Sequence, residues 1–459
     1  MSLLTVMAAE APRLDLTHSW VGYVGVATFL IAYLLVSIES RTHLRKAKPV
    51  IIAAGVIWLL AALAYARAGD TVTAGQVLRR DIGTFGELFL FILSAMTFVN
   101  TMEERQIFSA LRSWLIRKRL SLRTVFWATG LLSFLISSQI DNMTTALVMG
   151  TVVLTVGRGN IRFLVPACIN VVVAANAGGA WCAYGDITSL MVWQTGLLPF
   201  LAFFKLFVPA AVNWLVPALI MTLAVPRALP AAEQDEDIRV RQGGWLVVGL
   251  LALTLVLAVA SDQLLGLPPA LGMMTGLGLL NLYGFYLRRF GHEARAAVQH
   301  GVMPLEGIEV SPHRPRFDIF QILQRAEWDT LMFFYGVIVA IGGLEFMGQL
   351  GLLSKAMYTG LGATTANTLV GVVSAFVDNI PVMYSVIAMH PPMSQAQWLL
   401  VTMTAGVGGS LLSIGSAAGV ALMSQSRGVY TFASHLRWTW AVALGYAASI
   451  FVHLAINGG

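Results

Sequence analysis

The sequence predicts an all-α polytopic membrane protein built from two inverted-topology repeats. Of its 459 residues, 57% are hydrophobic and only 11% are charged, whereas an ordinary soluble domain has roughly 25% charged residues. The mean hydropathy is +0.75, and many apolar runs reach the roughly 20 residues that a helix needs to cross a bilayer. An Asp-Asn pair also interrupts the apolar sequence twice, in "SSQIDNMTTALVMG" and in "SAFVDNIPVMYSV". The composition excludes a small secreted domain, a nucleic-acid-binding protein and a coiled coil.

Hydropathy predicts about ten crossing segments and two re-entrant hairpins. The expected crossings cover residues 19–39, 47–66, 84–102, 162–194, 198–225, 244–261, 266–287, 329–349, 397–426 and 436–456. The hairpins are expected at 121–157 and 353–392, because each of these apolar stretches is long enough for two short arms and has an Asp-Asn pair near its centre. Each hairpin would enter and leave the membrane on the same side.

The distribution of positive charge predicts the orientation. With the N-terminus outside, all but six of the 29 Lys and Arg residues lie on the cytoplasmic side, as the positive-inside rule requires. Both termini are therefore expected to be periplasmic or extracellular. The two cysteines, Cys168 and Cys182, lie in apolar segments, which argues against a disulfide framework. The first 18 residues lack the pattern of a cleavable signal peptide.

The predicted domain boundaries follow from an acidic segment in the middle of the chain. Residues 226–243 contain this cluster and are expected to form a cytoplasmic linker between an N-terminal repeat, 1–225, and a C-terminal repeat, 244–459. A further cytoplasmic loop is expected at 288–328. Residues 104–120 are predicted to form an amphipathic helix on the inner membrane surface.

The two halves align around the Asp-Asn pairs. Asp141 and Asn142 match Asp378 and Asn379, and downstream "NAGGAWCAYGDITSL" matches "GVGGSLLSIGSAAGV". Each half then has five crossings, one hairpin and one broken crossing helix. Because five is odd, the second half is expected to be inverted. Glycines can also serve close helix packing, but two matched sets of breaks are typical of secondary transporters, whose sites lie near the membrane midplane.

The breaks carry the candidate ion-binding chemistry. A carboxylate at membrane depth normally marks an ion path or a proton relay, and Asp141, Asp186 and Asp378 lie at the expected breaks. Aspartate is also a good N-cap. A helix N-terminus by itself attracts anions, so a carboxylate at each hairpin tip reverses the local sign and favours a cation. Since oxygen ligands predominate there, we expect a small hard cation.

The candidate site residues fall into two groups. The expected ion- or proton-binding residues are Asp141, Asn142, Asp186, Asp378 and Asn379, with Na⁺ at the three aspartates. Secondary candidates with hydroxyl or amide groups are Thr144, Thr145, Asn176, Thr188, Ser374, Ser410, Ser413 and Ser416. Neighbouring carboxylates cannot all ionise without a large cost, so an incoming cation would displace protons. No cofactor is expected besides the transported ions.

The stretches "SSQIDNMTT", "NAGGAWCAYGDIT", "SAFVDNIP" and "GGSLLSIGSAAG" resemble the signatures of the NhaD-type bacterial sodium/proton antiporters of the ion transporter superfamily. The resemblance covers residues from about 84 to 455. It implies Na⁺ or Li⁺ efflux driven by proton entry across a bacterial inner membrane, an elevator-type movement and a homodimer. It also implies that Asp141, Asn142, Asp186, Asp378 and Asn379 form the ion site. The position aligned with Asp186 is Ser416, which favours one composite site over two symmetric sites.

Two other functions remain open at this stage. An anion or arsenite carrier of the same superfamily is possible, although dicarboxylate members have Ser-Asn-Thr tips and acidic tips disfavour a dianion. Uncharged arsenous acid is not excluded. An intramembrane aspartyl protease would also use two buried aspartates, but only Tyr184-Gly185-Asp186 matches its motifs. We therefore expect a transporter and not an enzyme, with the lipid bilayer and no nucleic acid as a partner.

Overall fold

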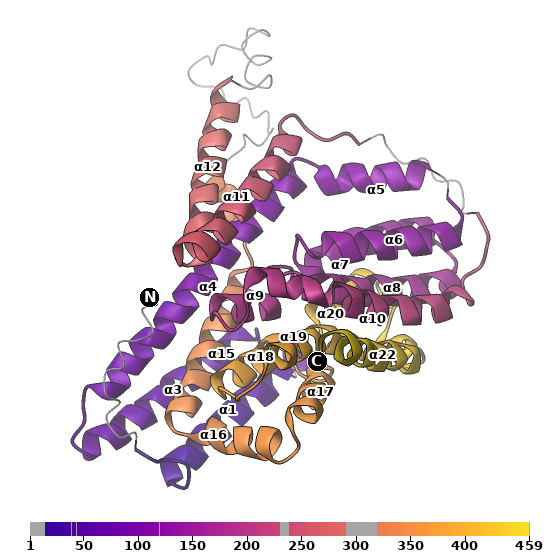
Figure 1. Cartoon of the computed structure of the whole chain (residues 1–459). Coiled ribbons are helices and arrows are strands. Elements are labelled where there is room, and N and C mark those ends of the chain that lie inside the picture. The colour runs from indigo at the N-terminus through magenta and orange to yellow at the C-terminus, as the bar shows by residue number, and fades with distance from the viewer. Residues whose placement is uncertain are drawn as a thin grey trace. The chain divides into compact units, whose positions relative to one another are not determined.

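The computed structural model describes residues 14–37, 39–42, 44–118, 120–229, 238–290 and 319–458, and every regular element in these ranges is a helix (Figure 1). Within them, eight helices are long and apolar enough to cross a membrane. They are α3 (Ala47–Arg67), α4 (Thr73–Glu104), α8 (Ile161–Ala180), η2 continued by α10 (Phe200–Thr222), α11 (Gly244–Leu265), α12 (Pro269–Phe290), α15 (Trp328–Phe346) and α22 (Thr439–Asn457). The prediction of an all-helical, multi-pass membrane protein is confirmed.

Two of the ten expected crossings form shorter helices than the other eight. The first is α1 (Trp20–Ser37), which has only a short apolar stretch, Trp20–Val36. The second, expected at 397–426, is interrupted and forms α19 (Gln395–Gly408) and α20 (Ala417–Gln425). Conversely, α4 is longer than its expected span because the helix continues through polar residues that hydropathy alone does not assign to the membrane.

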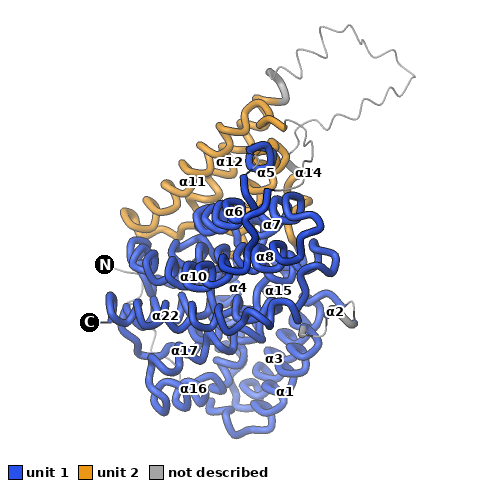
Figure 2. Tube along the Cα trace, turned by 90° about the vertical axis from the view of Figure 1, so that its right-hand side faces the viewer, with its two compact units in different colours: residues 1–86, 112–236, 328–459 blue, residues 87–111, 237–327 orange. Residues whose placement is uncertain are grey.

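The chain divides into two compact units, shown in blue and orange in Figure 2. Unit 1 contains residues 1–86, 112–236 and 328–459, and unit 2 contains residues 87–111 and 237–327. The repeat boundaries predicted from the sequence divide the chain differently, because each compact unit contains residues from both halves. The predicted boundaries therefore stay a prediction. Residues 230–237 of the expected linker and 291–318 of the expected cytoplasmic loop lie outside the described residues.

Unit 2 is built around the pair of helices α11 and α12. α11 ends at Gly266, whose φ of 63° is left-handed and easily adopted only by glycine. The Ser94 hydroxyl of α4 donates a hydrogen bond to the Met273 carbonyl of α12 at 2.8 Å. Unit 2 also contains the short helix α14 (Ile319–Gln324). The helix α5 (Ile107–Arg117) begins in unit 2 and continues into the residues of unit 1. α5 lies within the range predicted to form an amphipathic helix.

Unit 1 is organised around α8, which is buried along almost its whole length. The Asn170 side chain of α8 donates to the Phe126 carbonyl at 2.7 Å and accepts from the Trp214 indole N–H at 2.8 Å. These contacts tie α8 to α6 and α10. The remaining elements of this unit are α2 (Glu39–Thr42), α6 (Leu122–Ile136), α7 (Asn142–Val156), α9 (Ile187–Gln194), α16 (Gln349–Ser354), η3 (Lys355–Thr359), α17 (Ala363–Ser374), α18 (Asn379–Ala388) and α21 (Phe432–Leu436).

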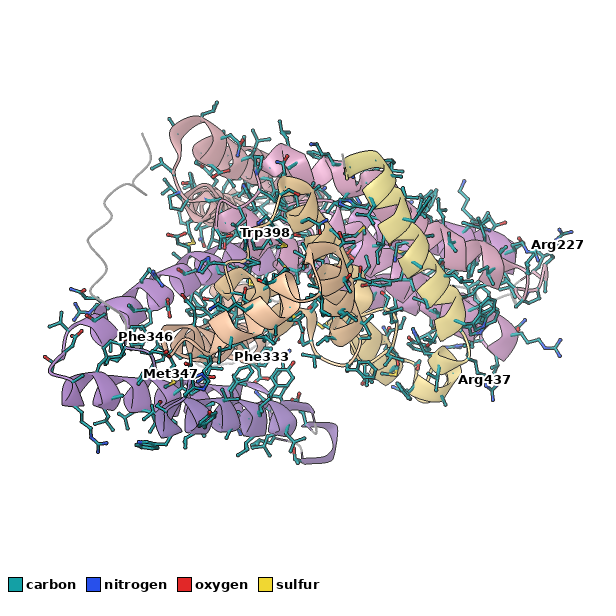
Figure 3. All side chains as sticks on the ribbon, turned by 60° about the horizontal axis from the view of Figure 1, so that its bottom comes forward. Arg227, Phe333, Phe346, Met347, Trp398 and Arg437 are labelled. Atoms are coloured by element: carbon teal, nitrogen blue, oxygen red, sulfur yellow. The ribbon has the colours of Figure 1, made fainter. Side chains whose placement is uncertain are left out.

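Helices α3 and α15 form a second packed region of unit 1. The Phe346 ring stacks on the rings of Trp58 and Tyr65, with centroids 5.4 and 4.5 Å apart. Figure 3 shows Phe346 and Met347 beside the helices of the first 67 residues, whereas Arg437 extends from the opposite side of the view. The Trp58 indole N–H also donates to the Val339 carbonyl at 2.8 Å. Aromatic packing and this buried hydrogen bond hold α3 firmly to α15.

Both Asp-Asn pairs lie where one helix ends and the next begins. α6 and α7 are joined by residues 137–141 and pack against each other, and α17 and α18 are joined by 375–378 and do the same. Further interruptions separate α8 from α9 at 181–186 and α19 from α20 at 409–416. These breaks bring polar residues and helix ends into the interior of unit 1.

The glycines beside the breaks make matching close contacts in the two halves. A Cβ on Gly178 would collide with the Phe134 carbonyl oxygen of α6, and one on Gly408 would collide with the Gly371 carbonyl oxygen of α17. A Cβ on Gly415 would likewise lie 2.5 Å from the Ala375 carbonyl oxygen. Close backbone approach therefore requires glycine at these positions.

Candidate functional site

Asp186 lies at the end of the 181–186 break and begins α9. Its Oδ1 accepts a hydrogen bond from the Ile187 N–H at 2.8 Å, and its Oδ2 accepts one from the Thr188 hydroxyl at 2.7 Å. Asp186 and Ser189 also form a capping box. The residue is 8% exposed. A carboxylate is therefore held in the interior of unit 1 by the helix end that it caps.

A residue from the second half of the chain completes the surroundings of this carboxylate. The Asn379 amide, in the first turn of α18, donates to Asp186 Oδ2 at 2.9 Å. Gly406 of α19 lies on another side, where a Cβ would be 3.5 Å from the same oxygen. The carboxylate of Asp186 thus lies where α9, α18 and α19 meet. This contact joins the tip of the second hairpin to the break of the first half.

The first hairpin tip makes a different set of contacts. Asp141 caps α7, with its Oδ1 accepting from the Thr144 N–H at 2.8 Å. The Asn142 amide donates to the Asn176 side-chain oxygen at 3.0 Å, and the Asn176 amide donates to the Ser410 hydroxyl at 2.8 Å. Uncharged side chains therefore connect α7, α8 and the 409–416 break. Asn176 and Ser410, two secondary candidates, are brought together.

Asp378 caps the second tip weakly. Its Oδ1 accepts from the Ile380 N–H at 3.4 Å, which is at the long end for a hydrogen bond. Its Oδ2 lies 3.9 Å from the Lys46 Nζ, and both side chains are partly exposed. Asp378 is therefore paired with a cationic side chain, whereas the other two aspartates of the predicted site form no ion pair with any residue that the structure describes.

The remaining secondary candidates serve different local contacts, and all of them except the half-buried Thr144 are buried. The Ser374 hydroxyl donates to the Ala405 carbonyl at 2.7 Å, and Ser416 caps α20 by accepting from the Gly419 N–H at 3.2 Å. The Thr145 hydroxyl is buried without a hydrogen-bond partner among the described residues. Ser413 is fully buried in the 409–416 break. Thr144 contributes its N–H to the Asp141 cap, and Thr188 its hydroxyl to Asp186, as described above.

The three aspartates share an electrostatic neighbourhood without converging on one point. The Asp378 and Asp141 carboxyls lie close enough to Asp186 to influence it electrostatically. Nevertheless, within the part of the chain that is described, no three His, Cys, Asp or Glu side chains gather at the spacing needed to hold a metal ion. A cation bound here would therefore take most of its ligands from amide, hydroxyl and main-chain carbonyl oxygens, as Na⁺-sized hard cations accept.

Two contacts near this region involve residues that the sequence analysis did not select. One is Lys46, which was counted only as a positive charge in a cytoplasmic loop. The other is His435, whose Nε2 lies 3.0 Å from the Ser410 carbonyl oxygen and whose Nδ1 lies 2.7 Å from the Tyr430 hydroxyl. In the sequence, His435 lies close to the basic residue Arg437. A histidine in such a basic segment is expected at the surface, so the sequence does not indicate that it is buried. Its contact to the 409–416 break depends on tertiary packing alone.

Comparison with known proteins identifies the family. The family model described as citrate transporter matches residues 4–406. The Na(+)/H(+) antiporter NhaD of Halomonas elongata is 51% identical over 457 residues, covering 98% of this chain and 91% of the relative. Proteins of the same name from Alkalimonas amylolytica and Vibrio cholerae are 49% and 48% identical, each over 98% of this chain and 94% of the relative.

All of these relatives are transporters, which confirms the prediction that the chain is not an enzyme. Identity near one half over almost the full length of both chains is far above the level at which membership of a family is in question. The motifs quoted from both halves of the sequence lie within the aligned region. The chain belongs to the NhaD-type sodium/proton antiporter family.

Proposed function

We propose that the chain exchanges Na⁺ or Li⁺ for H⁺ across the inner membrane, with carboxylates shared between the cation and the protons. Relatives named Na(+)/H(+) antiporter support the sodium and proton part of this proposal. The observation that carries it is the contact of Asn379 with Asp186 Oδ2 at 2.9 Å. It gives one buried carboxylate two neighbours, Asn379 and Thr188, that can change from hydrogen-bond donors to oxygen ligands.

The exchange follows from this chemistry. A hydroxyl can rotate its proton away and present a lone pair, and an amide can present its oxygen instead of its NH₂ group. When Na⁺ arrives, Thr188 and Asn379 turn their oxygens towards it, while Asp186 supplies the negative charge. A proton on the carboxylate would have to leave, because a protonated carboxyl is a poor cation ligand. Protons and Na⁺ therefore compete for Asp186, and alternating access converts that competition into exchange.

Asp141 and Asp378 are proposed to add negative potential, and one of them a ligand, at the hairpin tips. Electrostatic interaction of both with Asp186 supports this role. Occupation of one carboxylate by Na⁺ would relieve repulsion on the others. The composite site is thus centred on Asp186, and the aligned position, Ser416, supplies no charge.

The alternating-access part of the proposal rests on the internal repeat. Matching glycine contacts, Gly178 with Phe134 and Gly408 with Gly371, support two related halves of inverted topology. In this arrangement the α6–α7 and α17–α18 pairs are re-entrant hairpins that move with the site in an elevator-type step. By resemblance to the family we further propose a homodimer with both termini periplasmic. Light scattering in detergent tests the dimer, and cysteine labelling from either side tests the termini.

An anion carrier is the second candidate, favoured by one observation. The matching family model bears the description citrate transporter. A citrate trianion would have to approach Asp186 and Asn379 at a site that already carries negative charge, which costs several kcal/mol at membrane depth. Uptake of labelled citrate or arsenite by proteoliposomes that show no response to Na⁺ would favour this alternative over cation exchange.

The test of the proposed function is exchange in proteoliposomes. Wild-type protein is reconstituted with an imposed proton gradient, and the fluorescence of a pH dye is followed after addition of NaCl, LiCl, KCl or choline chloride. We expect dequenching with Na⁺ or Li⁺ and none with choline. Repeating the measurement with an imposed membrane potential determines whether the exchange is electrogenic. If proteoliposomes with the wild-type protein show no dequenching with any of these cations, the proposal is contradicted.

A further inference from the structure

Lys46 occupies an unusual position for a residue of a basic loop. It immediately precedes α3, and its Nζ lies 3.9 Å from Asp378 Oδ2 at the second hairpin tip. The same Nζ lies 4.8 Å above the centre of the Phe333 ring of α15. Neither partner of the ion pair is fully exposed, the side chains being 22% and 23% accessible. The ammonium therefore has two favourable contacts at once, one with a carboxylate and one with an aromatic face.

The chemistry of the ammonium makes it a substitute for the transported ion. A lysine Nζ is a compact charge of +1, the same charge as Na⁺. Asp378 uses Oδ1 to cap α18 and faces Lys46 with Oδ2. A cation that needs this oxygen must displace the ammonium, since two positive charges cannot share it at low cost.

We propose that Lys46 is a resident counter-ion that competes with the transported cation for Asp378 and ties the second hairpin tip to α3 while no cation is bound. This inference rests on the proposed function. When Na⁺ binds, the ammonium leaves the carboxylate and remains over Phe333. Lys46 is therefore a positioning residue, which lowers the apparent affinity for Na⁺ and couples cation binding to release of the tip.

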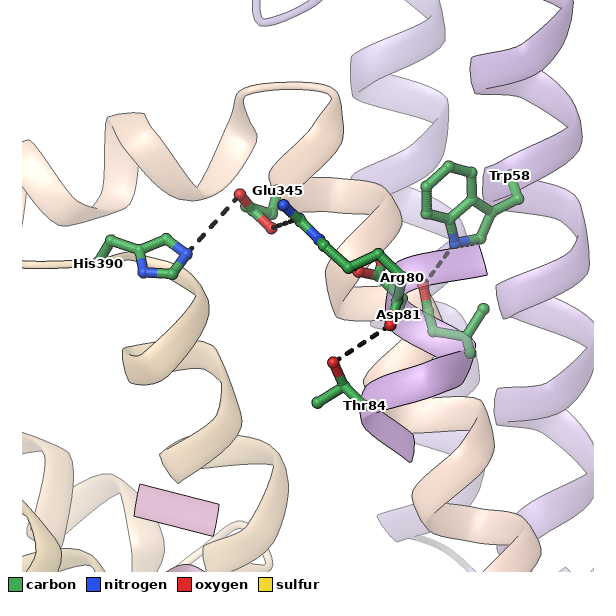
Figure 4. Close-up of polar contacts among 7 residues, drawn as sticks. Trp58, Arg80, Asp81, Thr84, Glu345 and His390 are labelled. Atoms are coloured by element: carbon green, nitrogen blue, oxygen red, sulfur yellow. Dashed lines mark hydrogen bonds and ion pairs between the residues drawn. The ribbon is translucent and has the colours of Figure 1, made fainter. Parts of the chain in front are cut away.

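The opposite end of α18 explains why the contact at the tip is the responsive one. There, beyond the helix, His390 Nε2 lies 4.0 Å from Glu345 Oε1 of α15, and Arg80 Nη2 lies 4.0 Å from Glu345 Oε2 (Figure 4). These polar contacts lie at the far end of α18 from Asp378 and Asn379. A cation at the site can break the Lys46 pair directly, whereas it does not reach the His390 end.

The first test uses wild-type protein in detergent and measures acylation of lysine side chains by an amine-reactive acetyl ester, followed by peptide mass spectrometry. Samples contain equal concentrations of NaCl or choline chloride, so that ionic screening is matched. A lysine whose ammonium is held in an ion pair is less accessible to the reagent and reacts slowly. We expect Na⁺ to speed acylation of Lys46 about fivefold, the scale of a partly exposed ion pair. Exposed Lys48 is the internal control and should not change.

The second test compares the Na⁺ dependence of transport by Lys46→Gln, Lys46→Arg and Lys48→Gln. Removing the competing charge should lower the KM for Na⁺ about fivefold in Lys46→Gln. Lys46→Arg keeps the charge and should stay within about twofold of wild type, as should Lys48→Gln. A general structural role would instead lower the maximal rate without lowering KM.

The outcomes separate this inference from the proposed function. If wild-type protein exchanges Na⁺ for H⁺ but Lys46 and Lys48 respond alike to Na⁺, the inference is wrong and the function stands. If the wild type exchanges no cation, the function itself fails. Should Lys46→Gln not fold, the acylation ratio of the wild-type protein decides alone.

Discussion

The two hairpin tips carry the same Asp-Asn pair but use it differently. At the first tip, Asn142 donates to Asn176 within its own half, and Asp141 caps its own helix. At the second tip, Asn379 donates to the Asp186 carboxylate of the other half, and Asp378 pairs with Lys46. The Asn142 amide of the first tip therefore joins a network of uncharged side chains, whereas Asn379 and Asp378 of the second tip each contact a charged side chain.

This difference bears on the proposal that two related halves share a single ion-binding centre. Each half has a capped helix end after its glycine pair, and we propose that the side chain at this position decides which of the two holds an ion. In the first half that side chain is Asp186, and in the second it is Ser416, which only caps α20. Gly406 takes the place of Asn176 in the alignment and leaves room beside Asp186.

The strongest test of the comparison removes the carboxylate of Asp186, because the aligned residue, Ser416, carries no charge. Asp186→Asn should lower the initial rate of Na⁺-driven dequenching by about 100-fold or more, because a buried carboxylate ligand contributes several kcal/mol. Ser416→Ala at the aligned position loses only a helix cap and should stay within about threefold of wild type. Equal losses in the two variants, measured on proteoliposomes with matched protein content, would show that the halves contribute alike.

The next largest effect separates the two asparagines. Asn379→Ala removes a hydrogen bond to a charged group and should raise the KM for Na⁺ about 30-fold. Asn142→Ala removes a bond between neutral groups and should change KM only about fivefold. The initial rate against Na⁺ concentration gives both values. If Asn142→Ala raises the KM for Na⁺ more than Asn379→Ala does, the ion site is centred on the first tip instead.

The glycine contacts predict similar losses of stability in the two halves. Gly178→Ala and Gly408→Ala each force a Cβ against a carbonyl oxygen and should destabilise the protein by about 1–3 kcal/mol. Gly83→Ala in α4 is the control, because open space surrounds that position and alanine there should stabilise by about 0.5–1 kcal/mol. Thermal unfolding in detergent measures all three. Destabilisation by only one of the first two would argue against matched packing.

The smallest expected effect isolates capping from ion binding. Asp70, outside the membrane-spanning helices, accepts hydrogen bonds from Thr73 and from the Val72 N–H, which lower the pKa of its carboxyl. A lowered pKa adds stability above the unfolded-state pKa, and this stability is lost as the pH falls through the folded-state pKa. Asp70→Asn should therefore slightly flatten the decline of the melting temperature between about pH 5 and pH 2, without changing the KM for Na⁺. If the melting temperature of Asp70→Asn depends on pH as that of the wild type does, the hydrogen bonds of Asp70 contribute no pH-dependent stability.

The sequence predicted much of this arrangement because the strongest signals are local. Hydropathy predicted the multi-pass helical fold, and "GG" followed by "GD" predicted the break before Asp186, since glycine permits close approach wherever it occurs. Asn176 and Ser410 were selected as polar residues near breaks. Their mutual hydrogen bond was not predicted.

The contacts between distant segments could not be predicted in this way. Asn379 and Asp186 were both candidates, but their bond depends on how α9 and α18 pack. Lys46 was interpreted through the positive-inside rule, which treats every basic loop residue alike. Its contact with Asp378 depends on the packing of both α3 and α18 against α15. His435 likewise contacts Ser410 only because of tertiary structure. Periodicity and composition contain no information about such pairs.

The most direct measurement of the central claim is the release of protons when Na⁺ binds. Purified protein in weakly buffered detergent receives NaCl or, as a control, choline chloride, and a pH indicator records the protons released. Competition at Asp186 predicts release by wild type and by Ser416→Ala, and none by Asp186→Asn. Binding of Na⁺ to wild type without any proton release, or undiminished release from Asp186→Asn, would contradict the proposed sharing of the Asp186 carboxylate.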